Sequence, residues 1–485
     1  MIQEGERFAL KDRAVSGFPV ASVSLDLEST EFHLTNANER KKNMTTITTK
    51  LDYQTILANQ GRPVNLTIAA KAPPAVSEQR KPIAFAISLD RSGSMHGRKL
   101  EQAKEACRGV IDNLRPEDFF GLVVFDQVAQ VVLPLRSGVD KAGAKNLVNR
   151  IYSGGSTNLG GGWALARDEL EKAPEGATRR MLLLSDGQAN VGIVDPVQLS
   201  SIAGDGLDRV GVRTSCLGFG DDYHEDLMSE MANASTGNFY DVVSADKLPE
   251  IFEAELDGIL GLVVQNLRVR VKPETFCDEW ASLGETPGHR LPDGRVELKL
   301  GDLVSEEERS FALAVRVEPI PLGADGSQVC SLEGEKLMSL EFLYDEITAD
   351  KIVSRRDSRL IRIKATQNPD EVTLDESVLP IVSAQQAAET IRRTIGKMDR
   401  NRFDEALRDL EDEAAKLRAH GRPELVKDGL AAIERAIRNH REGWRSRRGR
   451  KTARYDSRSL RRRSSREHWS GDESQRPSFK EPRPE

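Results

Sequence analysis

Six apolar segments alternate with six amphipathic segments between residues 81 and 262, and this pattern limits the possible folds more than any other feature of the chain. The strand candidates are 83–89, 120–125, 128–133, 180–185, 211–218 and 238–242, and the helix candidates are 98–113, 139–151, 161–172, 195–209, 223–234 and 245–260. Such alternation predicts a doubly wound α/β fold, in which helices cover both faces of a mostly parallel sheet. The run FGLVVFDQVAQVVLPL holds two strand candidates around a short turn, so we expect one antiparallel hairpin.

Segments in which apolar and polar residues alternate lie on both sides of this α/β region in the sequence. Alternating strands within 263–366 predict an antiparallel β-sandwich. Within 50–72, LDYQTIL and VNLTIAAKA indicate two more half-buried strands. Because these early strands have no obvious partners in the α/β region, we expect them to join the later sheet. The α/β domain would then be inserted in the sandwich rather than simply followed by it.

The last part of the folded chain has a helical pattern. Residues 378–442 carry apolar residues at i, i+3 and i+4 spacing, which predicts a C-terminal helical hairpin. We therefore divide the chain into a flexible leader (1–43), N-terminal strands and a linker (44–80), the α/β domain (81–262), the β-sandwich (263–366), the helical region (378–442) and a basic disordered tail (443–485).

Charge is distributed unevenly along the chain. The net charge is −7, but fifteen Lys and Arg against seven Asp and Glu give residues 441–485 a charge of +8, which leaves −15 on residues 1–440. Such a basic tail is typically disordered and solvated, and its alternative role is contact with nucleic acid or an anionic membrane. We find no signal peptide and no transmembrane segment, since no apolar stretch approaches the roughly 20 residues that span a bilayer. A cytoplasmic location is the default expectation.

Oxygen-bearing side chains follow the apolar runs on three loops of the α/β region. Asp90, Ser92 and Ser94 alternate in the run IAFAISLDRSGS, Thr157 lies in SGGSTNLGGG, and Asp186 follows MLLLS. Because ligands gather at the carboxyl ends of the strands in such sheets, we expect these loops to converge. Hydroxyls and carboxylates are hard donors, which suit Mg²⁺, or alternatively Mn²⁺ or Ca²⁺. The sequence therefore predicts a metal site, and the alternative is that the two serines only cap the following helix.

These three motifs resemble those of the von Willebrand factor A-type domain, the module that integrins carry as the I domain. The matching stretches are DRSGS, GGSTN and LLLSDG. The resemblance implies a metal-ion-dependent adhesion site in which Ser92, Ser94 and Thr157 contact the metal directly. Asp90 and Asp186 would complete or orient the ligand shell. The order of β-rich segments around the domain is also loosely similar to inter-alpha-trypsin-inhibitor heavy chain proteins and calcium-channel auxiliary subunits.

A binding function explains this site better than catalysis. We expect a non-enzymatic module whose metal captures an Asp or Glu carboxylate of a partner protein, with no small-molecule substrate. The alternatives are a regulatory subunit of an ATPase or metal-insertion complex and a metal-dependent hydrolase, in which His96 would act as the base. The run SGGSTNLGGG lacks the G-K-[ST] ending of a phosphate-binding loop, which argues against a nucleotide site.

Overall fold

The computed structural model describes residues 44–75, 82–220, 222–242, 247–284, 288–321, 333–348 and 352–443, together with Ala453 and Ser457. The leader predicted at 1–43 and nearly all of the tail predicted at 443–485 lie outside these residues. The chain divides into two compact units, Met1–Met44 and Thr45–Glu485, and every described element belongs to the second.

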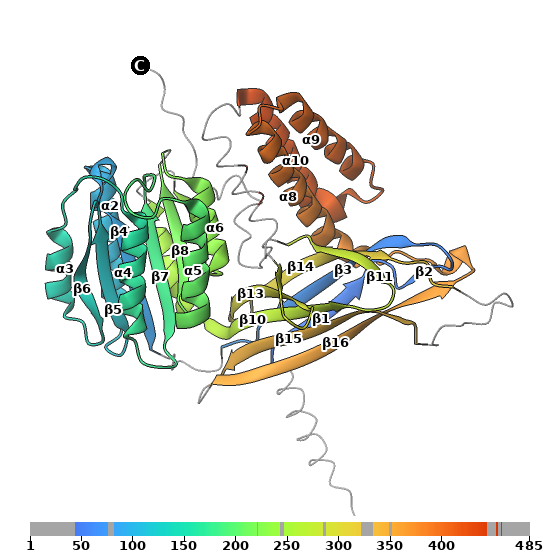
Figure 1. Ribbon diagram of the computed structural model, residues 1–485, viewed down its shortest axis with the longest axis horizontal. Helices are drawn as coiled ribbons and strands as arrows, with labels where there is room; N and C mark the ends of the chain where they lie inside the picture. The colour runs from blue at the N-terminus through green and yellow to red at the C-terminus, as the bar shows by residue number, and fades with distance from the viewer. Residues whose placement is uncertain are drawn as a thin grey trace, which may run out of the picture. The chain divides into compact units, whose positions relative to one another are not determined.

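The α/β region is built on a six-stranded sheet with the order β6-β5-β4-β7-β8-β9 (Figure 1). Its strands are β4 (Ile83–Asp90), β5 (Phe119–Phe125), β6 (Ala129–Arg136), β7 (Thr178–Ser185), β8 (Arg213–Phe219) and β9 (Phe239–Val242). Neighbouring strands are parallel except for β5 and β6, which form an antiparallel pair at the edge. The doubly wound fold and its edge hairpin are therefore confirmed.

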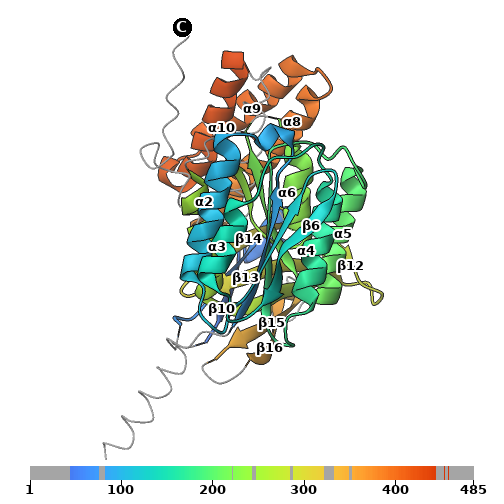
Figure 2. The same ribbon diagram turned by 90° about the vertical axis from the view of Figure 1, so that its left-hand side faces the viewer.

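Helices cover both faces of this sheet, as Figure 2 shows with α2 and α3 on one side and α4 and α5 on the other. The helices are α2 (Arg98–Asn113), α3 (Lys141–Asn149), α4 (Leu159–Glu171), α5 (Pro196–Val210), α6 (Glu225–Ala234) and α7 (Leu248–Leu260). Alternate residues of β4 enter different cores, with Phe85 and Ile87 on the side of α2 and with Ala84 and Ala86 on the side of α4. All eight residues of β4 are buried, as expected for a central parallel strand.

Two further sheets form the β-sandwich, with the orders β1-β3-β14-β11 and β12-β13-β10-β15-β16-β2. Their strands are β1 (Thr46–Leu51), β2 (Thr55–Leu57), β3 (Arg62–Lys71), β10 (Leu262–Pro273), β11 (Cys277–Ser282), β12 (Gly288–Arg290), β13 (Val296–Val304), β14 (Glu308–Val317), β15 (Glu335–Ile347) and β16 (Ile352–Thr366). One shared apolar core lies between them. β3 pairs with β14 along its whole length, so the α/β domain is inserted in the sandwich, as predicted.

The interpretation of LDYQTIL as a single strand is wrong. β1 ends at Leu51, the chain bends at Asp52, and β2 continues in the other sheet as a parallel partner of β16. The carboxylate of Asp52 accepts hydrogen bonds from the backbone nitrogen of Asn65 at 2.8 Å and from its side-chain nitrogen at 2.7 Å. These contacts fix the bend that sends the chain from one sheet to the other.

Three helices follow the sandwich: α8 (Leu379–Met398), α9 (Phe403–Arg418) and α10 (Pro423–Gly443). The last two form the predicted hairpin, and α8 joins them in one apolar cluster. Gln385 of α8 attaches this bundle to β14, since its Oε1 accepts a hydrogen bond from the backbone nitrogen of Ala312 at 2.8 Å. Over the described residues, no helix combines the length and the apolar character that crossing a membrane requires.

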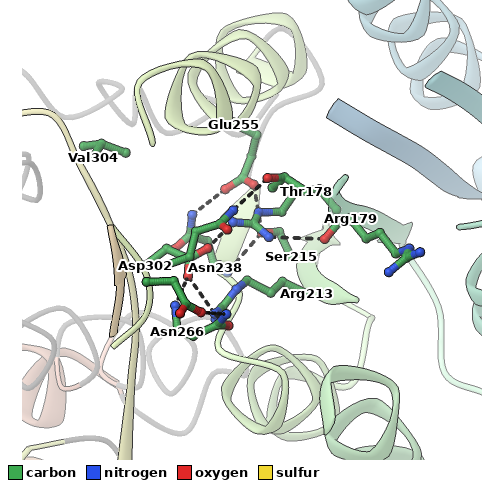
Figure 3. A network of polar contacts seen from close by, with 12 residues as sticks. Thr178, Arg179, Arg213, Ser215, Asn238, Glu255, Asn266, Asp302 and Val304 are labelled. Carbon is green, nitrogen blue, oxygen red and sulfur yellow. Dashed lines mark hydrogen bonds and ion pairs between the residues drawn. The ribbon is translucent and has the colours of Figure 1, made fainter. Parts of the chain in front are cut away.

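Buried polar contacts join the amino-terminal ends of β7 and β8 to the sandwich (Figure 3). Asp302 of β13 forms ion pairs with Arg180 and, at 2.6 Å, with Arg213. It also accepts a hydrogen bond from the backbone nitrogen of Asn266 at 2.9 Å. Burial by itself would raise the pKa of Asp302, but the two guanidinium groups and the hydrogen bonds outweigh it and hold the pKa below its ordinary value. We call Arg180, Arg213, Asn266 and Asp302 the junction.

The backbone of β10 is adapted to this junction. Asn266 has a φ of 57° and lies where the pairing register of β10 shifts against both neighbouring strands. Asparagine tolerates this left-handed conformation better than most residues. The resulting bulge lets its side-chain oxygen accept a hydrogen bond from Arg213 at 3.0 Å. Next to it, Gln265 donates to the hydroxyl of Thr178 at 2.7 Å.

Candidate metal site

Three loops meet at the carboxyl end of the α/β sheet. They follow β4, precede α4 and follow β7, and backbone hydrogen bonds connect them. The nitrogen of Gly93 donates to the oxygen of Gly155 at 2.8 Å, which links the first loop to the second. The nitrogen of Asn190 donates to the oxygen of Thr157 at 3.0 Å, which links the third loop to the second. The three sequence motifs therefore lie side by side.

Asp90 closes β4 at the base of the site and is fully buried. Its Oδ1 accepts a hydrogen bond from the backbone nitrogen of Ser92 at 2.7 Å, and its Oδ2 accepts one from the hydroxyl of Ser185 at 2.5 Å. Burial raises the pKa of Asp90 to about 6, although both hydrogen bonds act in the opposite direction. The carboxylate is thus held rigidly in a poorly solvated position.

The two serines connect the first loop to Asp186. The hydroxyl oxygens of Ser92 and Ser94 are 3.1 Å apart, and the hydroxyl of Ser94 donates to Oδ1 of Asp186 at 2.6 Å. Neither serine caps a helix, because Ser92 makes no side-chain capping bond to the short 3₁₀ turn Gly93–Met95 and the residue that precedes α2 is Gly97. The helix-capping alternative is therefore wrong.

Thr157 brings the second loop to the same place. Its side chain is buried, and its backbone nitrogen donates to the side-chain oxygen of Asn190 at 2.8 Å. A methyl group added at Gly187 would lie 3.4 Å from the hydroxyl oxygen of Thr157 and 3.7 Å from that of Ser94. The two hydroxyls therefore border one small space, which glycine keeps open beside Asp186. Ser92 contacts Ser94, and Asp90 contacts the backbone of Ser92 at the end of β4, so the five predicted residues lie on adjoining loops.

Sequence reasoning missed Lys99, which contacts the site directly. Its ammonium group lies 2.5 Å from Oδ2 of Asp186 and 5.4 Å from the centre of the Phe219 ring. A signal was present, because Arg98 and Lys99 open α2, and the positive end of a helix dipole disfavours cations. A lysine at this position indicates a nearby carboxylate. Ser185 and Asn190, which hold Asp90 and Thr157, left no comparable signal.

The donor set fits a hard divalent cation. In the part of the chain that the structure describes, no group of three or more His, Cys, Asp or Glu side chains is arranged to hold a metal ion. Hydroxyl groups would therefore have to supply donors here, together with water. Such an oxygen-only set suits Mg²⁺, which takes few carboxylates and keeps several of its waters. His96, the base of the hydrolase alternative, is exposed two residues beyond Ser94.

The fold and these motifs define a von Willebrand factor type A domain, and the family model of that domain matches residues 85–254. The match to this domain therefore covers residues 85–254, the greater part of the α/β region. A solved von Willebrand factor type A protein from Catenulispora acidiphila has a TM-score of 0.62 and 19% identity, and the match covers 82% of this chain and 90% of that one. The similarity thus extends beyond the domain to the fold of the surrounding segments.

Two curated relatives show how far the sequence similarity reaches. Inter-alpha-trypsin inhibitor heavy chain H4 of Homo sapiens is 33% identical over 277 residues, which are 50% of this chain and 29% of that protein. The protein sll0103 of Synechocystis sp. is 24% identical over 359 residues, which are 70% of this chain and 81% of that protein. The predicted resemblance to the heavy chains is confirmed, although this chain spans less than a third of heavy chain H4.

Proposed function

We propose that this protein is a non-enzymatic binding module in which a divalent cation, most suitably Mg²⁺, captures an Asp or Glu carboxylate of a partner protein. Ser92, Ser94 and Thr157 would hold the cation, with Asp90 and Asp186 beside them. The observation that carries this proposal is the convergence of the Ser94 and Thr157 hydroxyls on the open space at Gly187, next to Asp186. Ser94 is exposed, so this space is accessible to a partner.

The charges around the site support capture of a carboxylate. Asp90 and Asp186 supply two negative charges, and Lys99 supplies one positive charge through its contact with Asp186. Arg91 adds no further charge, because it forms an ion pair with Asp126 at 3.1 Å. With a divalent cation bound, the site has one net positive charge, which favours one carboxylate from outside. Without Lys99 the same site would be neutral.

The neighbouring side chains give little support to catalysis. The described polar groups at the site are engaged with one another, as in the hydrogen bonds of Ser185 to Asp90 and of Ser94 to Asp186. A hydrolase needs a base within hydrogen-bond reach of an attacking water. His96 is exposed, and the described structure records no carboxylate contact that would orient its ring. A binding role therefore accounts for these residues more completely.

Isothermal titration of the full chain with Mg²⁺ tests the proposal. We expect one site whose binding Asp90→Ala abolishes and Ser94→Ala weakens by at least about tenfold. Ser94 is exposed, so this second variant keeps the test valid if the buried substitution disturbs folding. Asp168→Ala is the matched control, because Asp168 forms an exposed ion pair with Arg167 on α4. Unchanged Mg²⁺ affinity in the Asp90 and Ser94 variants would refute the site.

A further inference from the structure

Exposed apolar side chains gather beside the candidate metal site. Eight large hydrophobic side chains are exposed in the described part of the chain, and five of them lie on the loops or in the first turn of α5 at this end of the sheet. We call these five the apolar rim: Val128, Tyr152, Ile193, Val194 and Val197. Single exposed hydrophobic residues are normal on protein surfaces, whereas a concentration of them marks an interaction site.

The first two rim residues lie on segments that are bound to the metal-site loops. Val128 is in the turn between β5 and β6, where its backbone nitrogen donates to Oδ1 of Asp126 at 3.0 Å. The backbone oxygen of Asp126 in turn accepts a hydrogen bond from Asn158, the neighbour of Thr157, at 2.7 Å. Tyr152 lies in the Thr157 loop itself. Both side chains are therefore held at the same end of the sheet as the proposed ligands.

The other three rim residues lie on the segment that follows Asp186. This segment is fixed to the Thr157 loop by Asn190, and it continues through Ile193 and Val194 into α5. The carboxylate of Asp195 caps α5 by accepting a hydrogen bond from the backbone nitrogen of Val197 at 3.1 Å. The rim is thus carried by defined turns and a capped helix, so its side chains need little ordering when a partner binds.

Folding of the chain does not account for the rim. Tyr152 is 74% exposed and Val197 is 73% exposed, so neither gains much from burial in the folded chain. The equivalent positions at the other end of β7 and β8 hold Thr178 and Arg213, which are engaged with the sandwich. Apolar groups left in water at one end of the sheet require an explanation outside the folded chain itself.

We infer that the apolar rim binds large apolar side chains that flank the captured carboxylate, so the partner is a protein segment with an Asp or Glu between large apolar residues. This preference depends on the proposed metal-dependent capture, because the cation and Lys99 attract the acid. The body of the chain, residues 1–440, has a charge of −15 and repels a polyacidic surface. A single carboxylate in an apolar setting therefore fits better than an acidic patch.

Peptide selection tests this inference without knowledge of the partner. The full chain is immobilised in Mg²⁺, random phage-displayed peptides are bound, and those released by EDTA are sequenced. We expect an Asp or Glu flanked by Leu, Ile or Phe. The affinity of a selected synthetic peptide, measured by fluorescence anisotropy, should fall about tenfold in the Tyr152→Ser/Val197→Ser double variant. Leu360→Ser is the matched control, since Leu360 on β16 is also exposed and should not affect binding.

The outcomes separate this inference from the proposed function. EDTA-released peptides that carry an acid without apolar neighbours would refute the binding role of the apolar rim, and so would an unchanged peptide affinity in the double variant. Either result would leave the proposed metal-dependent capture intact. Absence of both EDTA-sensitive peptides and Mg²⁺ binding would overturn the two together. Self-association in analytical ultracentrifugation that the same double variant abolishes would assign the rim to a second copy of the chain, against the partner inferred above.

Discussion

The two ends of the strands in the α/β sheet differ in how completely their side chains are engaged. At the amino-terminal ends, Arg180 and Arg213 form ion pairs with Asp302 of the sandwich, and their side chains are 11% and 7% exposed. At the carboxyl ends, Ser94 and the apolar rim are exposed. One end therefore contributes to stability, and the other carries the exposed side chains of the proposed binding surface. Substitutions at the two ends should consequently separate the free energy of unfolding from the affinity for metal.

Asp302→Ala should have the largest effect. It leaves two largely buried arginine side chains without their carboxylate, which should lower the free energy of unfolding by about 3–5 kcal/mol in urea titrations of the full chain. Mg²⁺ affinity of the folded variant should be unchanged, because the proposed metal site is at the other end of the sheet. Asp278→Ala is the control, since its ion pair with Arg316 is exposed and should contribute less than about 1 kcal/mol. Equal losses of unfolding free energy in the two variants would show that the junction is not a major source of stability.

Acid should remove the contribution of the junction. The pKa of Asp302 is lowered in the folded protein, so its stabilisation is complete above the ordinary aspartate pKa of about 3.9 and is lost as pH falls through the lower folded value. The difference in unfolding free energy between the wild type and Asp302→Ala should therefore be constant from pH 5 to pH 7, and it should shrink below about pH 4. A difference that grows on acidification would contradict this assignment.

A pair of isosteric substitutions compares the two ends directly. Thr157→Val removes a hydroxyl at the metal site and should lower Mg²⁺ affinity about tenfold or more with little loss of stability. Thr178→Val removes the acceptor of the Gln265 hydrogen bond next to the junction and should cost about 1 kcal/mol of stability with no change in Mg²⁺ affinity. Calorimetric titration measures the Mg²⁺ affinity of both variants, and urea unfolding measures their stability. Each variant should change only one of these two quantities. If the two variants change the same quantity, the two ends of the sheet do not have separate roles in stability and metal binding.

Lys99→Met should produce the smallest effect, and it should raise Mg²⁺ affinity where Thr157→Val lowers it. Removing the positive charge beside Asp186 should raise Mg²⁺ affinity about fivefold, an effect that decreases with added salt. The same variant should bind a carboxylate peptide more weakly, because the loaded site loses its net positive charge. Lys99→Arg keeps the charge and serves as the control. A lower Mg²⁺ affinity in Lys99→Met would show that the lysine positions Asp186 rather than competing with the cation.

Local sequence patterns were sufficient to predict the α/β region. The predicted helix at 98–113 matches α2 at both ends, and the strand predicted at 83–89 differs from β4 by one residue. These elements are set by periodic apolar residues within a few turns of chain, which a sequence displays directly. A general rule places ligands where parallel strands end, and it correctly predicted that the loops of the five candidate residues meet. Their role as metal ligands stays a prediction.

Contacts between distant residues were not predictable in this way. The bend at Asp52 depends on Asn65, and the ion pair of Lys99 joins it to Asp186 on another loop. The pairs of Asp302 with Arg180 and Arg213 likewise link strands of different sheets. No periodicity marks such partners, since each residue alone resembles an ordinary polar or charged surface residue. Only a cation in the first turn of α2 offered a local hint.

The pairing of β3 with β14 also affects the order in which the parts of the chain can fold. During synthesis, β3 emerges before the entire inserted domain, and its partner β14 emerges only afterwards. The α/β domain, whose contacts are local by comparison, can fold on the ribosome while the paired strands β1 and β3 still lack β14 on the other edge of β3. An unpaired strand edge of this kind invites intermolecular pairing. Slow completion of the sandwich, rather than failure of the α/β domain, is therefore where we expect refolding yields to be lost.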